Sequence, residues 1–121
     1  MYKTPWDPWE YSQVCIVTAW PLNNTTIILA DYTNIGTYLL SSTFIKWSDW
    51  KVEDWNEFIL NAPGENNINK TGITKFGVRE ARYDRANRAP VWQEHKEVRC
   101  SWWTAEKGEG FKPELVVTYQ P

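Results

Sequence analysis

The sequence has very little of what catalysis usually requires. Its 121 residues include a single histidine, His95, which stands between two charged residues, Glu94 and Lys96. Neither Cys100 nor Ser101 comes with a supporting nucleophile motif. The chain also has no glycine-rich phosphate loop and no cluster of histidine and cysteine at metal-ligand spacing. We therefore expect a protein that is not an enzyme.

An excess of positive charge and a long apolar run are also missing. Thirteen basic residues are mixed with fifteen acidic ones along the chain, for a net charge of −2. Binding to nucleic acid needs clustered lysine and arginine, and a membrane span needs about 18 apolar residues in a row. We therefore expect neither binding to nucleic acid nor insertion into a membrane. The start, 1–8, lacks the apolar stretch of a signal peptide. If the protein is exported, the numbering describes a mature form, an excised domain, or a chain released without a cleaved signal.

Carboxylates supply the remaining candidates for chemistry. Glycoside hydrolysis uses a pair of carboxylates, and such pairs occur at Asp49 with Asp54 and at Glu94 with Glu97. Such pairs scatter over any solvated surface, so we do not expect hydrolysis. Hard oxygen ligands for calcium occur in loops around Asp31, Asp49, Asp54 and Asp84, although no Asp-x-Asp-x-Asp loop is present. We expect no resident cofactor, with calcium as the candidate metal.

Strand-like runs account for most of the chain. They are rich in β-branched and aromatic residues, are separated by turn residues, and cover 13–19, 26–30, 37–46, 55–61, 72–82, 95–103 and 113–119. The connection 62–67 leaves room for one helical turn. In the last run, Leu115, Val117 and Tyr119 share one face. This pattern predicts an all-β fold, a jelly-roll-like antiparallel β-sandwich, in a single domain over 13–121.

The segment 1–12 predicts an extended N-terminal arm. It contains two prolines and the aromatic residues Trp6, Trp9 and Tyr11. Such an arm can fill a groove of a neighbouring subunit by strand addition. The alternative is that it folds back onto its own sheet or frays. Its aromatic content favours exchange between subunits.

Two cysteines, Cys15 and Cys100, lie in the first and the sixth strand-like run. They are either two buried free thiols or one disulfide that joins the two strands. We expect the disulfide, which would indicate an oxidising compartment. The glycosylation triplets at Asn23, Asn24 and Asn69 are compatible with such a compartment.

Nine tryptophans are many for so short a chain. Trp47, Trp50 and Trp55 fall within nine residues, close to Asp49. Flat aromatic faces beside carboxylates suit a sugar ring, and the same residues suit subunit packing or the ends of a sandwich core. Trp92 and Trp103 are further candidates, and we expect Trp103 to point away from the core.

Several motifs of the second half follow one another in a recognisable order. They are the stretches 55–61 (WNEFILN), 68–79 (INKTGITKFGVR), 83–84, 89–90, 105–106 and 112–119 (KPELVVTY). Over 26–121 the chain resembles the C-terminal two-thirds of the DNRLRE-type, disaggregatase-related β-sandwich domains of archaeal and bacterial surface proteins and phage structural proteins. Such domains usually begin with two or three further strands, and here the short arm stands in their place.

The resemblance implies structural roles for a few residues. Gly72 and Pro90 fit the pattern as structural positions, and Arg79 with Asp84 is expected to form an ion pair that fixes the following loop. Some relatives of this kind bind carbohydrate.

We therefore expect a structural subunit of an extracellular assembly, such as a surface filament, a sheath or a virion appendage. Its expected partners are copies of itself. The alternative function is a carbohydrate-binding module that uses exposed tryptophans and takes polysaccharide as its partner.

Overall fold

The computed structural model describes residues 12–89, 94 and 100–120. These residues form one antiparallel sheet of four strands with almost no helix, which agrees with the expected all-β class. The strands are β1 (Gln13–Ala19), β2 (Ile35–Leu39), β3 (Ile45–Lys46) and β4 (Gly77–Glu80). The helical elements are α1 (Ala62–Asn66) and the 3-10 turns Leu29–Thr33, Trp47–Asp49 and Ala105–Lys107. No second sheet occurs among the described residues.

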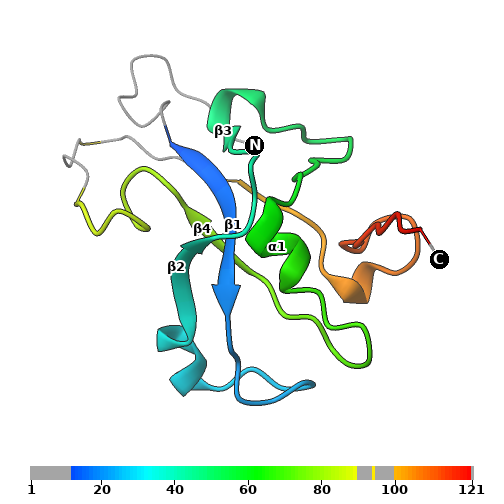
Figure 1. Ribbon diagram of the computed structural model, residues 1–121. Coiled ribbons are helices and arrows are strands. Elements are labelled where there is room, and N and C mark those ends of the chain that lie inside the picture. The colour runs from blue at the N-terminus through cyan, green and yellow to red at the C-terminus, as the bar shows by residue number, and fades with distance from the viewer. Residues whose placement is uncertain (1–11, 90–93, 95–99, 121) are drawn as a thin grey trace.

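Strand β1 is the centre of the sheet (Figure 1). Val14 pairs with Ile45 of β3 and also with Glu80 of β4, so β3 and β4 lie on opposite edges of β1. Val17 pairs with Leu39 of β2 in the same way, opposite β4. Strands β2 and β3 therefore follow one another along one edge of β1, and β4 occupies the other edge.

The burial of side chains alternates along β1. Cys15 and Val17 are fully buried, whereas the residues between and beside them are partly exposed, as expected of a strand with one face in the core. Ala81 and Leu39 pack against the two buried side chains. The prediction of a strand over 13–19 is confirmed to the residue.

The predicted strand 37–46 is interrupted. Its two ends pair with β1, but the segment between β2 and β3 leaves the regular ladder. The side-chain oxygen of Ser41 accepts a hydrogen bond from the Ile16 N–H at 3.1 Å, and Leu40 N–H donates to Ile16 O at 2.9 Å. The interruption therefore costs β1 no hydrogen bond at this point.

The helical turn expected in 62–67 is present as α1. It follows Asn61, whose side chain accepts a hydrogen bond from Gly64 N–H at 2.9 Å, and it carries Pro63 in its first turn. Asn61 N–H also donates to Leu40 O, and its amide nitrogen donates to Leu39 O. The helix is thereby held beside the end of β2.

Charged side chains fasten the turn that follows β4. The Glu80 carboxylate accepts hydrogen bonds from the backbone N–H groups of Arg82, Tyr83 and Asp84 at 2.6–3.0 Å. Arg79 makes a two-pronged ion pair with Asp84 at 2.8 and 2.9 Å. The expected ion pair is thus present, and it closes the turn directly after the strand.

Three more predicted strands do not form, and the run 72–82 is a strand only over Gly77–Glu80. The run 26–30 passes into the 3-10 turn Leu29–Thr33 instead of a strand. The run 55–61 forms an isolated bridge at Leu60 with Ser41. The run 113–119 has no strand pairing among the described residues, and Leu115, Val117 and Tyr119 are all exposed instead of forming a core face.

The run 95–103 lies partly outside the described residues, which resume at Cys100, and 100–103 is not a strand. The described helices include none that is long and apolar enough to cross a membrane.

Candidate functional site

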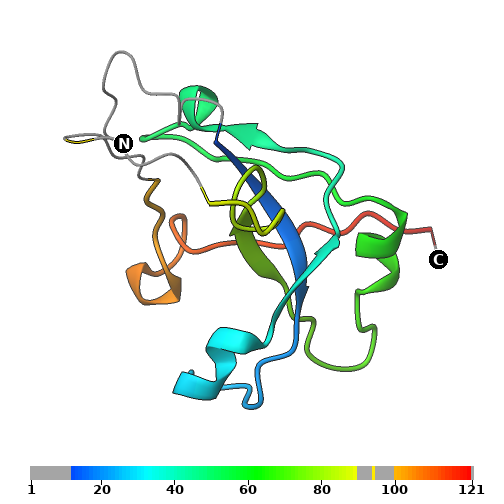
Figure 2. The ribbon, with the colours of Figure 1, turned by 90° about the vertical axis from the view of Figure 1, so that its left-hand side faces the viewer.

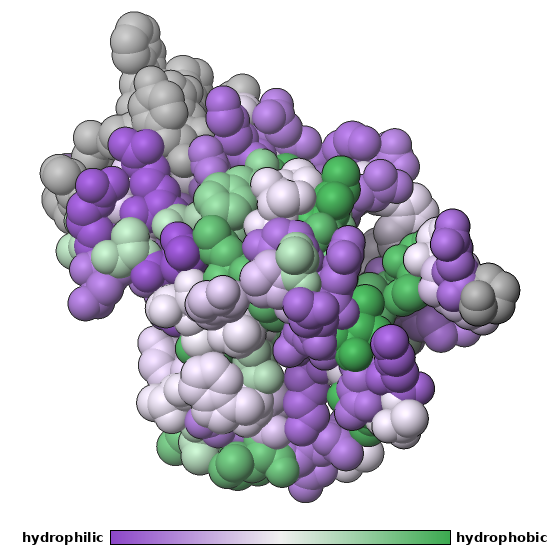
Figure 3. All heavy atoms as spheres, viewed as in Figure 1, coloured by the Kyte–Doolittle hydropathy of each residue, from purple (hydrophilic) through white to green (hydrophobic). Residues whose placement is uncertain are grey.

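The most unusual surface is the loop that joins β1 to β2, which we call the apolar loop (residues 20–34). Leu29 is 93% exposed and Tyr32 is 86% exposed, although both are large apolar side chains. The other exposed apolar residues of the loop are Trp20, Leu22, Ile27 and Ile28. Figures 1 and 3 share one view, in which hydrophobic side chains gather at the lower end, where this loop lies. A gathering of exposed apolar side chains on one loop is a mark of an interaction site.

A buried carboxylate holds the apolar loop in shape. Asp31 accepts hydrogen bonds from Ile28 N–H at 3.0 Å, from Leu22 N–H at 2.9 Å and from the Asn34 side chain at 3.3 Å. The backbone N–H groups of Ile28 and Leu22 lower the pKa of Asp31 below its ordinary value, because they stabilise the charged form. Asp31 therefore joins the first and the second half of the apolar loop through one carboxylate.

Two further contacts fix the ends of the loop. Trp20 N–H donates to Asn34 O at 2.9 Å, which closes the loop at its base. Lys75 reaches over from the segment before β4 and donates to Pro21 O at 3.0 Å. The loop thus presents its apolar side chains from a backbone that is already organised, and such surfaces lose little entropy on binding.

The predicted tryptophan patch does not form one open face. Trp47 and Trp50 are buried, and Trp50 packs edge-on against Trp102 while its indole N–H donates to Ser101 O at 3.2 Å. Trp55 is 43% exposed. The residues Trp47 and Trp50 instead match the alternative role in the core.

The other candidate tryptophans are divided. Trp103 is exposed, as expected, and packs edge-on against Phe111 with the Lys107 ammonium 4.3 Å from its ring. Trp102 is exposed as well. Trp92 lies outside the described residues, as do Trp6, Trp9 and Tyr11 of the arm and the residues His95 and Glu97.

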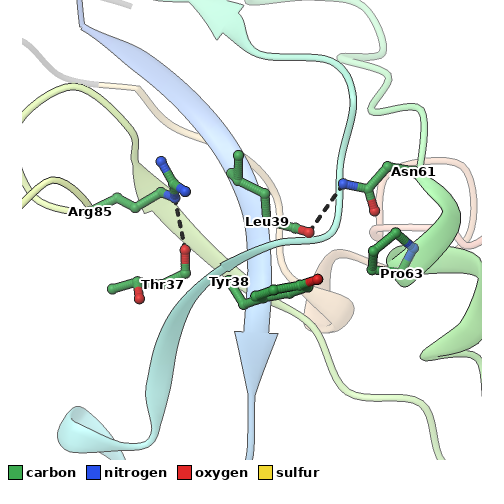
Figure 4. Close-up of a pocket in the computed structure, with 6 residues that line it drawn as sticks. All are labelled: Thr37, Tyr38, Leu39, Asn61, Pro63 and Arg85. Atoms are coloured by element: carbon green, nitrogen blue, oxygen red, sulfur yellow. Dashed lines mark hydrogen bonds between the residues drawn. The ribbon is translucent and has the colours of Figure 1, made fainter.

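An open hollow of about 470 Å³ lies over β2 (Figure 4). The Tyr38 ring stands in it between Arg85 and Pro63. Arg85 donates through Nε to Thr37 O at 2.8 Å. A tyrosine face beside a guanidinium and a proline can accept a flat polar ligand such as a sugar ring. Sequence reasoning missed this hollow because its lining comes from three separate stretches of the chain.

The candidate calcium ligands are not gathered. Among the described residues, no group of three or more histidine, cysteine, aspartate or glutamate side chains could hold a metal ion. The carboxylates of Asp31 and Asp84 are taken up by hydrogen-bond donors, and Asp54 accepts from Trp55 N–H at 2.7 Å. Asp49 is exposed at the end of its 3-10 turn.

Both cysteines are free thiols in the structure. Cys15 is buried under the turn after β4 and its sulfur lies 3.5 Å from Arg79 O, while Cys100 is partly buried elsewhere in the chain. Burial raises the pKa of each thiol. The expected disulfide is not formed here.

The glycosylation triplets lie on exposed turns. The side-chain oxygens of Asn23 and Asn69 each accept hydrogen bonds from the backbone and the hydroxyl of the threonine two residues on. Asn24 is exposed beside the first of them. All three asparagines are exposed.

Comparison with protein families, with curated proteins and with solved structures gives no match for this chain.

Proposed function

We propose that this chain is a non-enzymatic structural subunit of an extracellular assembly, such as a surface filament, a sheath or a virion appendage. The observation that carries the proposal is the apolar loop, in which Asp31 holds Leu29 and Tyr32 in the solvent. Soluble monomers rarely expose large contiguous apolar patches, and such patches mark interaction sites. A subunit interface would bury these side chains, among them Tyr32, which is a residue type enriched where binding energy is concentrated.

The sandwich and the arm belong to this proposal as well. One sheet has a single apolar core on one face, so a second layer from a neighbouring chain would complete a jelly-roll-like β-sandwich. The arm with Trp6, Trp9 and Tyr11 is the segment proposed for exchange. The resemblance to DNRLRE-type domains supports this proposal, since those domains recur in surface and phage structural proteins.

The test is the concentration dependence of mass in solution, measured by light scattering with negative-stain microscopy. Leu29→Asp should weaken assembly at least tenfold, because an anchor then carries a charge into the interface. Val52→Asp is the matched control, since Val52 is also exposed but lies outside the apolar loop. Deletion of residues 1–12 should abolish polymers. A wild-type chain that stays monomeric up to millimolar concentration would refute the proposal.

A carbohydrate-binding module is the second candidate, and the hollow over β2 is the observation that favours it. Tyr38 offers an exposed ring face and Arg85 a cation beside it. Affinity electrophoresis in gels that contain single polysaccharides would test this function. Tyr38→Ala should remove any retardation that the wild type shows, whereas Trp55→Ala should remove it if the tryptophan region is used. Equal migration of wild type and both variants in every gel would eliminate this candidate.

A further inference from the structure

The segment 113–119 has the residues of a β-strand but no strand partner among the described residues. Leu115, Val116, Val117 and Tyr119 are all exposed, with Val116 at 83%. Residues 113–120 make no hydrogen bond to any described residue and belong to no strand. A strand normally buries at least one of its two faces. Here both faces of an apolar segment meet solvent.

The chain just before this segment is fixed in place. Trp103 and Phe111 pack edge-on at 6.4 Å, and Lys107 lies over both rings. Lys112 pairs with Glu109 directly before the segment begins. Figure 2 shows the chain running from the turn at 105–107 behind β1 and onward to the C-terminal end. The segment therefore follows a loop that is closed by its own contacts, and Trp50 joins the start of that loop to the rest of the chain.

One edge of the sheet has backbone N–H and C=O groups that pair with no described residue. Ala81 N–H donates to Gln13 O at 2.7 Å, so Arg79 and Gly77, which alternate with it, also turn toward β1. Val78 then presents its N–H and C=O to the outside of β4, and no described residue pairs with them. The opposite edge is different, because side chains of Arg85 and Asn61 already occupy carbonyls of β2. The open edge is therefore that of β4.

We propose that segment 113–119 adds as a strand to the outer edge of β4 in a second copy of this chain. This inference rests on the proposed function and adds one contact between copies to those proposed for the apolar loop and the arm. A second copy is the occupant because a donor segment and an open acceptor edge occur on the same chain without pairing to each other. Such a contact uses two different surfaces, so it continues from copy to copy and produces a ring or a filament.

Proline substitutions in the full chain test both sides of the contact. Successive residues of a strand turn their N–H groups to opposite edges, so at least one of Val116→Pro and Val117→Pro must remove a bonded N–H. Val78→Pro removes the outward N–H of the acceptor and leaves the pairing with β1 intact. The variants Val116→Thr and Val117→Thr keep a β-branched residue and serve as controls.

The readouts are mass by light scattering and hydrogen exchange of residues 115–119. We expect at least one of the segment prolines, and also Val78→Pro, to raise the midpoint concentration of assembly tenfold or more. The threonine controls should stay within twofold, and the amides of 115–119 should gain protection as the protein assembles.

Different results would overturn different statements. If the wild type assembles and all three proline variants assemble equally well, the strand contact is refuted and the assembly function stands. If the amides of 115–119 are already protected in the dilute monomer, the segment pairs within its own chain and the contact is again refuted. If the wild type never assembles, the proposed function itself falls.

Discussion

Arg79 offers the sharpest test of how the sheet is held together. Its guanidinium binds both carboxylate oxygens of Asp84 and also donates through Nη1 to Gly36 O at 3.1 Å and Ile35 O at 3.3 Å. Since β4 and β2 lie on opposite edges of β1, this side chain spans the central strand. Arg79→Met keeps the apolar stem and removes every one of these hydrogen bonds.

The magnitude follows from exposure. Asp84 is 53% exposed and the Arg79 side chain 22%, so the ion pair itself contributes about 0.5–1 kcal/mol. The two bonds to β2 carbonyls are charge-assisted, the one to Gly36 O is partly buried, and together they contribute about 2 kcal/mol. Arg79→Met should therefore cost about 3 kcal/mol, which corresponds to a fall in Tm of about 12 °C for 121 residues. Asp84→Asn should cost about 1 kcal/mol, or about 4 °C.

The Tm of the wild type and of both variants is measured by thermal unfolding, followed by circular dichroism, at low salt and at 0.5 M NaCl. Salt should reduce the effect of Asp84→Asn, because it screens the exposed pair, and should leave most of the effect of Arg79→Met. If the two variants lose the same Tm at both salt concentrations, the bonds across β1 contribute nothing and the reasoning is refuted.

Three further predictions concern other parts of the chain. The pKa of Asp31 is lower in the folded protein, so the stability that Asp31 contributes is present above its ordinary pKa of about 3.9 and is lost as pH falls through the folded pKa. Asp31→Asn should therefore flatten the acid side of a plot of Tm against pH. An unchanged slope would contradict this prediction. Gly64→Ala places a methyl group 2.1 Å from a backbone carbonyl and should cost about 2–3 kcal/mol in chemical denaturation, whereas Gly72→Ala meets a movable side chain and should cost less; equal losses would show that α1 can shift. Free Cys15 and Cys100 should give two reactive thiols in denaturant without reductant, and none would show that they form the disulfide expected from the sequence.

Local signals were enough for some elements. Strand β1 could be predicted because 13–19 is a short run rich in β-branched residues and the turn residues Asn23 and Asn24 follow it. The turn of α1 could be predicted from the proline and glycine of 62–67, and Asn61 caps it. The all-β class follows from the same kind of signal.

Other parts depend on contacts that no local pattern contains. The run 26–30 has strand-forming residues, but Asp31 captures the N–H groups of Ile28 and Leu22 and bends the chain into a 3-10 turn. An aspartate directly after the apolar run was the available signal. The hollow over β2 had none, because Arg85 and Tyr38 are brought together by the sheet.

The segment 113–119 shows a third reason for failure. Its residues favour a strand, but the predicted strand is absent, because pairing needs a partner edge and the sequence does not say where that partner lies. The same limit applies to Trp47 and Trp50, whose spacing does not distinguish an open face from a core.

The central position of β1 also governs how the chain is made. Cys15 meets Arg79 across 64 residues, and a ribosome that adds about 5–20 residues per second takes roughly 3–13 seconds to deliver the second after the first. During that interval β1 can form a hairpin with β2 while its other side stays bare. Closing so long a loop is slow in free solution too. The nascent polypeptide is therefore most exposed to chaperones and to premature association before β4 emerges, and substitutions that speed the docking of β4 should improve the yield of native protein.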